Sequence, residues 1–420
     1  MATRSEVIYQ SIALFVSDVT GDQAITPEGV PSGNVSALQR VTDINWGGEV
    51  ARQDINCMGK LAATAREIIE EPTVSLDFSY YLANAYNENA IGLAVEGYGH
   101  ASDVNLISGV LADAFGSSEK NYYILTAAQG QDADGVKPTG LANTGYGVIG
   151  IGNAFLSDYT VNLAVGDIPN ASVTFDAANL TFDQLSGLIT GSPGAPDNHW
   201  ITGFQNPAIK RTEGTDLQDL QFTGMVILPP FLSQGATGGT SVDPNDREVS
   251  VAALRPGDIT VDFDAASVKA GNLKAGGAIL PGMASATDNQ SAHVQSVTIG
   301  VPLSRTPLTR LGNPFAFARK IDVPINTTLT VAANVGDLTT GSLVDLLCAD
   351  DDGRDIQITL GERCGAANNM VYQLKNAQLD SQSMSVNIGD SETVDLTFTA
   401  QIGGYNDVTD GVFLSGQNVG

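Results

Sequence analysis

The sequence lacks any apolar run that approaches the ~20 residues needed for a transmembrane helix. Its first residues, MATRSEVIYQSIALFVSD, also lack the layout of a signal peptide, because the short apolar stretch meets Ser17 and Asp18 without a small-residue cleavage site. These absences predict a soluble chain that is neither secreted nor membrane-bound.

Cysteine is scarce and irregularly placed. The odd number of cysteines and their uneven spacing argue against a disulfide framework and fit a reducing compartment. The three are Cys57, Cys348 and Cys364.

Histidine is equally scarce, and the pairings that bind metals are missing. His100, His199 and His293 stand in unrelated contexts, and the chain has no HExxH, CxxC, nucleophile elbow or phosphate-binding loop. The acidic loops at 132–135 and 350–355 have the oxygen density that calcium uses, but neither completes a calcium-binding loop with a closing Glu. We interpret them as solvated turns and predict no metal and no cofactor.

Basic residues are few, with 20 Lys and Arg against 47 Asp and Glu, which gives a net charge of −27. Such a surface repels phosphates, so we do not expect ordinary DNA or RNA binding. The charge indicates either solubility at high concentration or a surface past which DNA moves without adhering.

Aromatic residues are 6% of the chain, with only Trp46 and Trp200 as tryptophans. A carbohydrate-active enzyme needs two carboxylates converging in an aromatic-lined cleft. No pair of acidic residues stands out for that role, so we predict that the chain is not an enzyme.

What the chain does have is an internal repeat. Residues 41–78 align with 294–331 without a gap at an offset of 253, and nine of the 38 positions are identical. Residues 153–175 align with 376–398 at an offset of 223, in the same order along the chain. A conserved order of matching blocks indicates a duplicated structural unit.

Both copies have the alternating pattern of strands. Apolar and polar residues alternate along 72–83 and 325–333, which places the apolar set on one face. Strands are also expected at 5–17, 38–50, 121–127, 354–360, 147–165, 171–181, 370–388 and 393–402. The Gly166-Asp167 and Gly389-Asp390 pairs predict hairpin turns that place Asp167 and Asp390 at matching positions. Helical spacing predicts one helix in each copy, at 102–115 and 340–350.

We therefore predict a mainly β protein with two tandem copies of an antiparallel β-sandwich or barrel, each with one flanking α-helix. The expected domains are 1–182 and 251–402. A Gly- and Pro-rich insertion or linker, with a flexible stretch at 233–248, occupies 183–250, and a loosely docked arm occupies 403–420.

Two arginine pairs recur in a chain poor in basic residues: Arg52 matches Arg305, and Arg66 matches Arg319. They are either edge charges with local carboxylate partners or equivalent ion pairs across successive interfaces, where a guanidinium makes bidentate contacts. Gly59 and Gly312 are expected to form the same tight bend twice. No site chemistry stands out among the shared residues, so we consider them structural or inter-subunit positions.

The repeated pattern resembles the tail tube proteins of long-tailed bacteriophages. A long alternating strand follows a shared series of residues in each copy. The series consists of an arginine, an apolar residue, a Met or Leu before glycine, and an A-x-A-R-x-I run. The matching positions are Arg52, Ile55, Met58, Gly59, Ala63, Ala65, Arg66 and Ile68, and again Arg305, Leu308, Leu311, Gly312, Ala316, Ala318, Arg319 and Ile321. The resemblance covers roughly half of the chain.

This resemblance implies a structural virion protein whose rings stack head-to-tail into a tube for DNA ejection. With a duplicated fold, three chains would form a pseudo-hexameric ring. The implied partners are the chain itself, other tail proteins at the tube ends, and DNA that passes without specific binding. The implied location is the virion tail, after assembly in the host bacterial cytoplasm. Loops such as 51–71 would bridge rings.

The large middle insertion, 183–290, departs from a plain tube protein. It leaves open another β-rich phage role, such as a tail terminator or adaptor, a baseplate ring, a capsid decoration or a fibre component.

Overall fold

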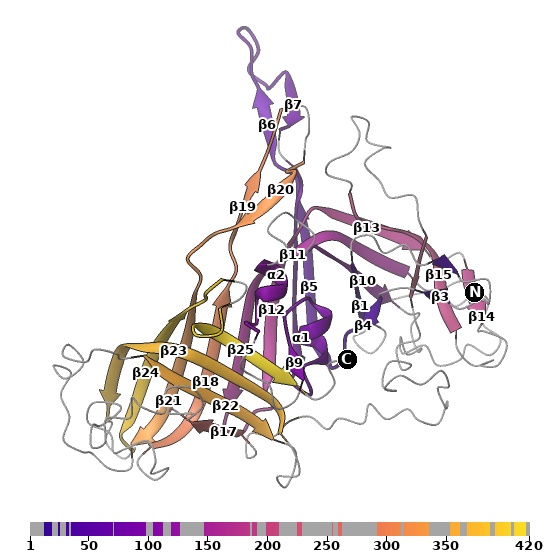
Figure 1. Ribbon diagram of the computed structural model, residues 1–420. Coiled ribbons are helices and arrows are strands. Elements are labelled where there is room, and N and C mark those ends of the chain that lie inside the picture. The colour runs from indigo at the N-terminus through magenta and orange to yellow at the C-terminus, as the bar shows by residue number, and fades with distance from the viewer. Residues whose placement is uncertain are drawn as a thin grey trace.

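The computed structural model describes residues 12–18, 24–25, 31–32, 35–69, 71–97, 104–111, 119–126, 147–184, 187–190, 199–209, 225–228, 254, 259–262, 292–311, 315–335, 353–361, 368–386, 391–404 and 407–416. The chain is mainly β, as predicted, and its sheets are antiparallel. One short parallel contact joins β9 (Glu96–Gly97) to β25 (Gly411–Gly416). Figure 1 shows strands from distant parts of the sequence side by side in one continuous body.

Eight strands from both halves of the sequence form one sheet, which we call the shared sheet. In spatial order they are β5 (Val41–Glu49), β8 (Thr73–Tyr81), β12 (Asn170–Ala177), β11 (Gly147–Ala164), β18 (Ala292–Pro302), β21 (Asn326–Val335), β24 (Thr393–Gln401) and β23 (Asn368–Ser385). The halves meet where β11 pairs with β18. Alternation of apolar and polar residues makes one face of this sheet a core face.

The long strands β11 and β23 each change partners midway. The first part of β11 pairs with β10 (Lys120–Thr126) and β13 (Asn179–Gln184), and β1 (Ile12–Asp18) and β4 (Ser36–Ala37) extend that group. The first part of β23 pairs with β22 (Arg354–Gly361) and β25, and β17 (Ile259–Asp262) follows β22. Asn153 and Asn376 have φ values of 54° and 56° where these changes occur. Asparagine tolerates this left-handed conformation better than most residues.

The same strand pairings recur in both halves at the offsets of the sequence repeat. Trp46 lies opposite Leu76 as Ile299 lies opposite Leu329. The bulge that follows Leu156 in β11 recurs after Leu379 in β23. The alignment of the sequence therefore extends to the register of individual residue pairs.

The described helices are short. Of the expected helix 102–115 the structure describes 104–111, and within these residues α2 spans Ser108–Leu111; α1 lies earlier, at Tyr86–Ala90. Asn105 forms a bridge with Phe413 and donates a side-chain hydrogen bond to the Asp410 carbonyl, so sheet contacts replace the first helical turn. The expected helix at 340–350 lies outside the described residues.

The insertion contains a small sheet that the expected linker at 183–250 does not anticipate. Its strands are β14 (Gly187–Thr190), β15 (His199–Gln205) and β16 (Met225–Leu228). Phe204, Val226 and Leu228 are buried in a cluster with residues of β1 and β10, so apolar burial holds this sheet in place. The expected flexible stretch, 233–248, lies outside the described residues.

The expectation of a loose arm at 403–420 is wrong for β25. All six residues of this strand are buried, and it pairs with β23 in the register in which β13 pairs with β11. Its apolar residues Val412, Phe413 and Leu414 explain the burial. The short strands β2 (Ala24–Ile25) and β3 (Pro31–Ser32) form a separate pair.

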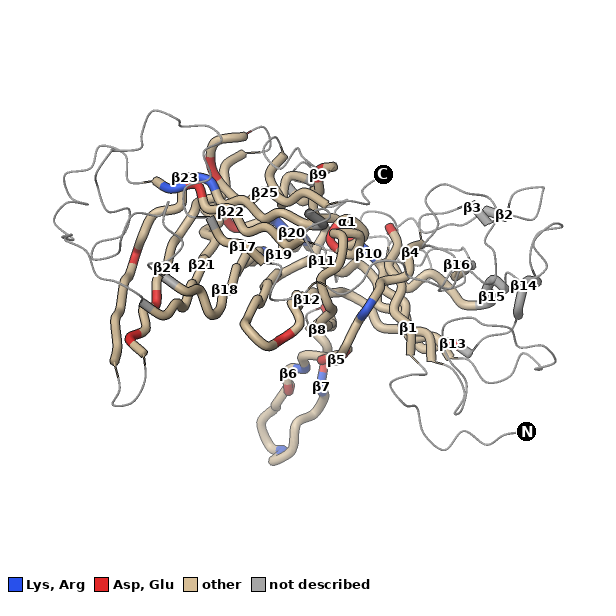
Figure 2. The backbone as a smooth tube through the Cα atoms, turned by 90° about the horizontal axis from the view of Figure 1, so that it is seen from below, with Lys and Arg blue, Asp and Glu red and all other residues tan. Residues whose placement is uncertain are grey.

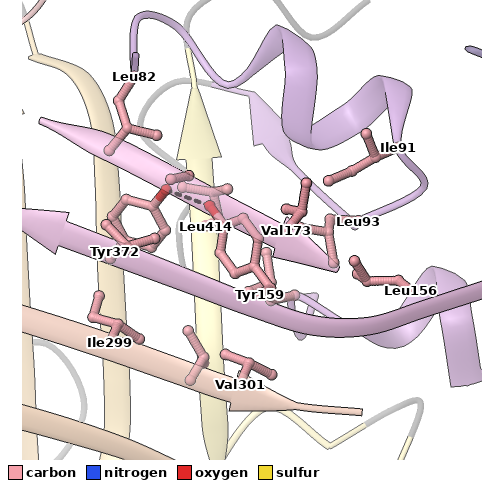
Figure 3. Packing of buried hydrophobic residues seen from close by; sticks show 14 of the residues in the cluster. Leu82, Ile91, Leu93, Leu156, Tyr159, Val173, Ile299, Val301, Tyr372 and Leu414 are labelled. Atoms are coloured by element: carbon pink, nitrogen blue, oxygen red, sulfur yellow. Dashed lines mark hydrogen bonds between the residues drawn. The ribbon is translucent and has the colours of Figure 1, made fainter. Parts of the chain in front are cut away.

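The main hydrophobic core is one cluster with residues from both halves. Ile299 and Val301 of β18 pack beside Leu156 and Tyr159 of β11 (Figure 3). The hydroxyls of Tyr159 and Tyr372 are 2.8 Å apart and hydrogen-bonded, which joins β11 to β23 across the core. The two halves therefore depend on each other for the burial of their apolar faces.

A carboxyl group lies buried in this core. Glu88 of α1 is 2% exposed, and the hydroxyl of Tyr159 donates a hydrogen bond to its Oε1 at 3.5 Å. Desolvation raises the pKa of Glu88 to about 7, although hydrogen bonds from its surroundings lower it in part. The pKa of Tyr372 is also raised, first by burial and then by the charge of Glu88.

We predict that Glu88 makes stability fall as the pH rises from about 4.5 to about 7. In that interval the folded state keeps a proton that the unfolded state has lost, and the loss amounts to about 3 kcal/mol in all. Glu88→Gln removes the titrating group, so its urea midpoint should exceed that of the wild type at pH 8 and approach it at pH 5. Equal midpoint differences at both pH values would contradict this assignment.

Candidate assembly surface

Two long hairpins project from the shared sheet at matching places. The first consists of β6 (Arg52–Ile55) and β7 (Ala65–Ile68), between β5 and β8, and the second of β19 (Arg305–Leu308) and β20 (Ala318–Ile321), between β18 and β21. Arg52 lies opposite Ile68 as Arg305 lies opposite Ile321, so the registers are the same. Figure 1 shows β6 and β7 extending well away from the body of the molecule.

The second hairpin packs against the first half of the chain. The guanidinium groups of Arg305 and Arg319 lie 4.8 and 5.4 Å from the ring centre of Phe155, a fully buried residue of β11. Nη2 of Arg319 is 3.1 Å from Oε1 of Glu71, and these two side chains are only 9% and 12% exposed. The other Glu71 oxygen, Oε2, accepts a hydrogen bond from the backbone N–H of Ala316. Glu71 therefore links the base of the first hairpin to the second hairpin.

The first hairpin has no such setting among the described residues. Nε of Arg66 donates a 2.6 Å hydrogen bond to Asp54 within the same hairpin, and both side chains are at least half exposed. Arg52 is also exposed. The structure therefore brings Arg305 and Arg319 together on Phe155 and leaves their counterparts facing solvent.

Two of the remaining predicted positions, Gly59 and Asp167, lie in turns. Gly59 is at the exposed tip of the first hairpin with φ +84°, which a side chain would strain. Asp167 follows Gly166, whose φ is 95°, and its N–H donates to the Ala164 carbonyl, as the predicted hairpin turn requires. Gly312 and Asp390 lie outside the described residues.

Exposed apolar side chains on the hairpins and the sheet edges were not predicted as a site. Met58, Leu61 and Leu311 at the hairpin tips are fully exposed, and Trp46, Val50, Met384 and Val386 at the sheet edges are 36%, 43%, 39% and 69% exposed. Burial of such side chains against another molecule would be favourable. The sequence alignment could have identified two of them, because it matches Trp46 with Ile299 and Val50 with Leu303. In the structure Ile299 and Leu303 are fully buried.

The solvent face of the shared sheet is polar and has no cation. Serine, threonine and asparagine alternate with the buried residues, and Asp77, Asp158, Asp176 and Asp395 add negative charge. The eight strands contain no arginine and one lysine, Lys375, which lies in the first part of β23, outside this face, and is buried. Figure 2 shows β8, β12, β18, β21 and β24 without blue positions.

The described part of the chain contains a small cavity beside α1. Its volume is about 10 Å³, room for one water molecule. No group of three His, Cys, Asp or Glu in the described ranges could hold a metal ion. No helix in these ranges is both long and apolar enough to cross a membrane.

No protein-family model and no curated protein matches the chain.

The matched arginines make a paired prediction. Arg319→Ala leaves Glu71 buried without its cation, so the free energy of unfolding should fall by about 3 kcal/mol, the scale of a broken buried pair. Arg66→Ala removes an exposed pair and should cost less than about 1 kcal/mol. Denaturant unfolding of the two variants measures the difference, and similar losses would contradict the contrast between the hairpins.

Proposed function

We propose that the chain is a structural virion protein that assembles into stacked rings and forms a phage tail tube. In this proposal it consists of two tandem copies of one β-sandwich unit, with a small extra sheet in the insertion. Three chains form each ring, the shared sheets line the channel, and the protein has no catalytic role. The chain's partners are copies of itself, other tail proteins at the tube ends and DNA in transit, and it works in the virion tail.

The cation-free face of the shared sheet is the observation that supports this proposal best. DNA has one negative charge per ~1.7 Å of helix axis, and proteins hold it mainly through Lys and Arg. A conduit must avoid such contacts along its wall. A wall of hydroxyl and amide groups with scattered carboxylates offers hydration and weak repulsion instead.

The exposed hairpin tips are the observation that favours stacking in this proposal. Their tips bear fully exposed Met58, Leu61 and Leu311, and burial of one such side chain contributes ~1.5–3 kcal/mol. In the tube these tips contact the next ring.

A second candidate is another ring-forming or decorating protein of the phage particle. The sheet β14–β15–β16 favours it, because this sheet is an addition that has no counterpart among the described residues of the second half. A terminator, adaptor or baseplate ring would form single rings, whereas a decoration or fibre protein would have no channel.

The proposal is tested by electron microscopy of the purified chain at high concentration. We expect hollow, stacked rings with three-fold symmetry and the shared sheet facing the channel. A chain that stays monomeric at every concentration, or rings with this face outward, would contradict the tube assignment. Single rings that never stack would favour the second candidate.

The charge argument has its own test. Ser172→Lys combined with Thr330→Lys places cations on the solvent face of β12 and β21, so the assembled variant should retain DNA at low salt where the wild type does not. The control, Gln53→Lys with Thr309→Lys, places the same charges on the hairpins. Electrophoretic retardation of DNA within assembled tubes measures the effect. Equal retention by wild type and sheet variant would overturn the DNA-conduit argument.

A further inference from the structure

We propose that the outer edge of the second part of β23 pairs antiparallel with β5 of a second copy of this chain, with Met384 opposite Trp46 and Val386 opposite Ile44. This inference rests on the proposed function only in requiring that the chain assembles with itself. It names the strands and the residue register of the contact between chains.

The template is the junction inside the chain. β11 pairs with β18 in antiparallel register, with Val161 opposite Ile299 and Leu163 opposite Val297. These four side chains are at most 3% exposed, and they join the apolar faces of the two halves. Two further backbone hydrogen bonds, from Leu303 N–H to Ser157 O and from Val165 N–H to Gln295 O, extend the ladder at both ends.

Each half of this junction recurs elsewhere in the chain, and there no described strand takes the partner's place. By the repeat offsets, β23 is the counterpart of β11 and β5 is the counterpart of β18. The second part of β23 pairs only with β24, and β5 pairs only with β8, among the described strands. An edge strand that no described strand covers can pair with another strand.

The side chains on these two edges fit the same junction. Val161 corresponds to Met384 and Leu163 to Val386, whereas Ile299 corresponds to Trp46 and Val297 to Ile44. Met384, Val386 and Trp46 are 39%, 69% and 36% exposed, although they lie on the core-facing side of their strands. Val50 at the end of β5 is 43% exposed, whereas its counterpart Leu303 is fully buried. Apolar residues thus occupy both edges where the internal junction buries its own.

The two edges differ from each other, so the contact is head-to-tail. One chain offers β23 and the next offers β5, and such heterologous contacts generate a ring when the rotation between copies closes. The occupant of both edges is therefore another copy of this chain. Pairing of β23 with β23, or of β5 with β5, would not reproduce the internal junction, because that junction joins two different strands.

Disulfide trapping tests the register. Met384→Cys and Trp46→Cys are introduced together in a chain with Cys57, Cys348 and Cys364 replaced by serine. Directly opposed residues of antiparallel strands have Cβ atoms ~4.5–5.5 Å apart, which small movements bring into disulfide range. Mild oxidation of the assembled protein should link chains into covalent oligomers that reduction separates.

The matched control is Ser383→Cys with Trp46→Cys. A shift by one residue moves the side chain to the opposite face of the strand, so this pair should not link. Absence of links in the Met384–Trp46 variant, or equal linking in the control, would overturn the proposed register. If the chains link efficiently but electron microscopy shows particles that are not tubes, the register is supported and the tube function is rejected. If tubes form but the chains do not link, the tube function is supported and the register is rejected.

A charge variant provides a readout that does not depend on disulfide chemistry. Met384→Lys places a cation at a position that is exposed in the single chain, so the variant should still fold. Pairing with β5 would bury this charge, so the pairing should be blocked. Ser383→Lys, on the polar face of the same strand, is the control and should assemble. Sedimentation velocity should show Met384→Lys as monomer at concentrations where the control is oligomeric. Assembly of both variants would overturn the inference.

Discussion

The antiparallel ladder between β11 and β18 is the constraint on which the rest of the structure depends. It joins two sets of strands that are far apart in the sequence into one sheet, and so gives the chain a single core. Without it, the apolar faces of β12 and β21 would each lack their neighbours across the junction. Tyr159 and Tyr372 reinforce the same link on the other side of the core, where a buried hydroxyl pair satisfies both polar groups.

The two hairpins show how one framework is used in two surroundings. Arg305 and Arg319 lie over Phe155, and Arg319 also pairs with Glu71 where water is largely excluded. By the repeat offsets, Phe155 corresponds to Gln378 and Glu71 to Pro324, neither of which offers an aromatic ring or a carboxylate. If the first hairpin meets a neighbouring copy as the second hairpin meets the first half, its arginines would not find the same partners there.

Much of the fold was predictable, because the alternation of apolar residues is a local signal and the internal repeat can be read from the sequence itself. The expected strands at 72–83, 121–127 and 354–360 agree with β8, β10 and β22 to within two residues. What the sequence could not show depends on contacts across long separations. The residues of β25 were predicted to be an arm, because the sequence does not show that β23 is their partner strand. The matched arginines look equivalent in the sequence, but Phe155 and Glu71 lie beside only one pair in the structure.

In the proposed assembly, the acidic composition and the apolar edges would have opposite effects. Copies with a net charge of −27 repel each other. Salt screens this repulsion beyond about 8 Å, so the repulsion acts mainly near contact. There the burial of side chains such as Trp46 and Met384 must outweigh it. Wrong pairings of the polar faces gain no such burial, so the charge opposes them while the edges favour one register. In the proposed tube, the scarcity of basic residues would serve specificity in assembly as well as the passage of DNA.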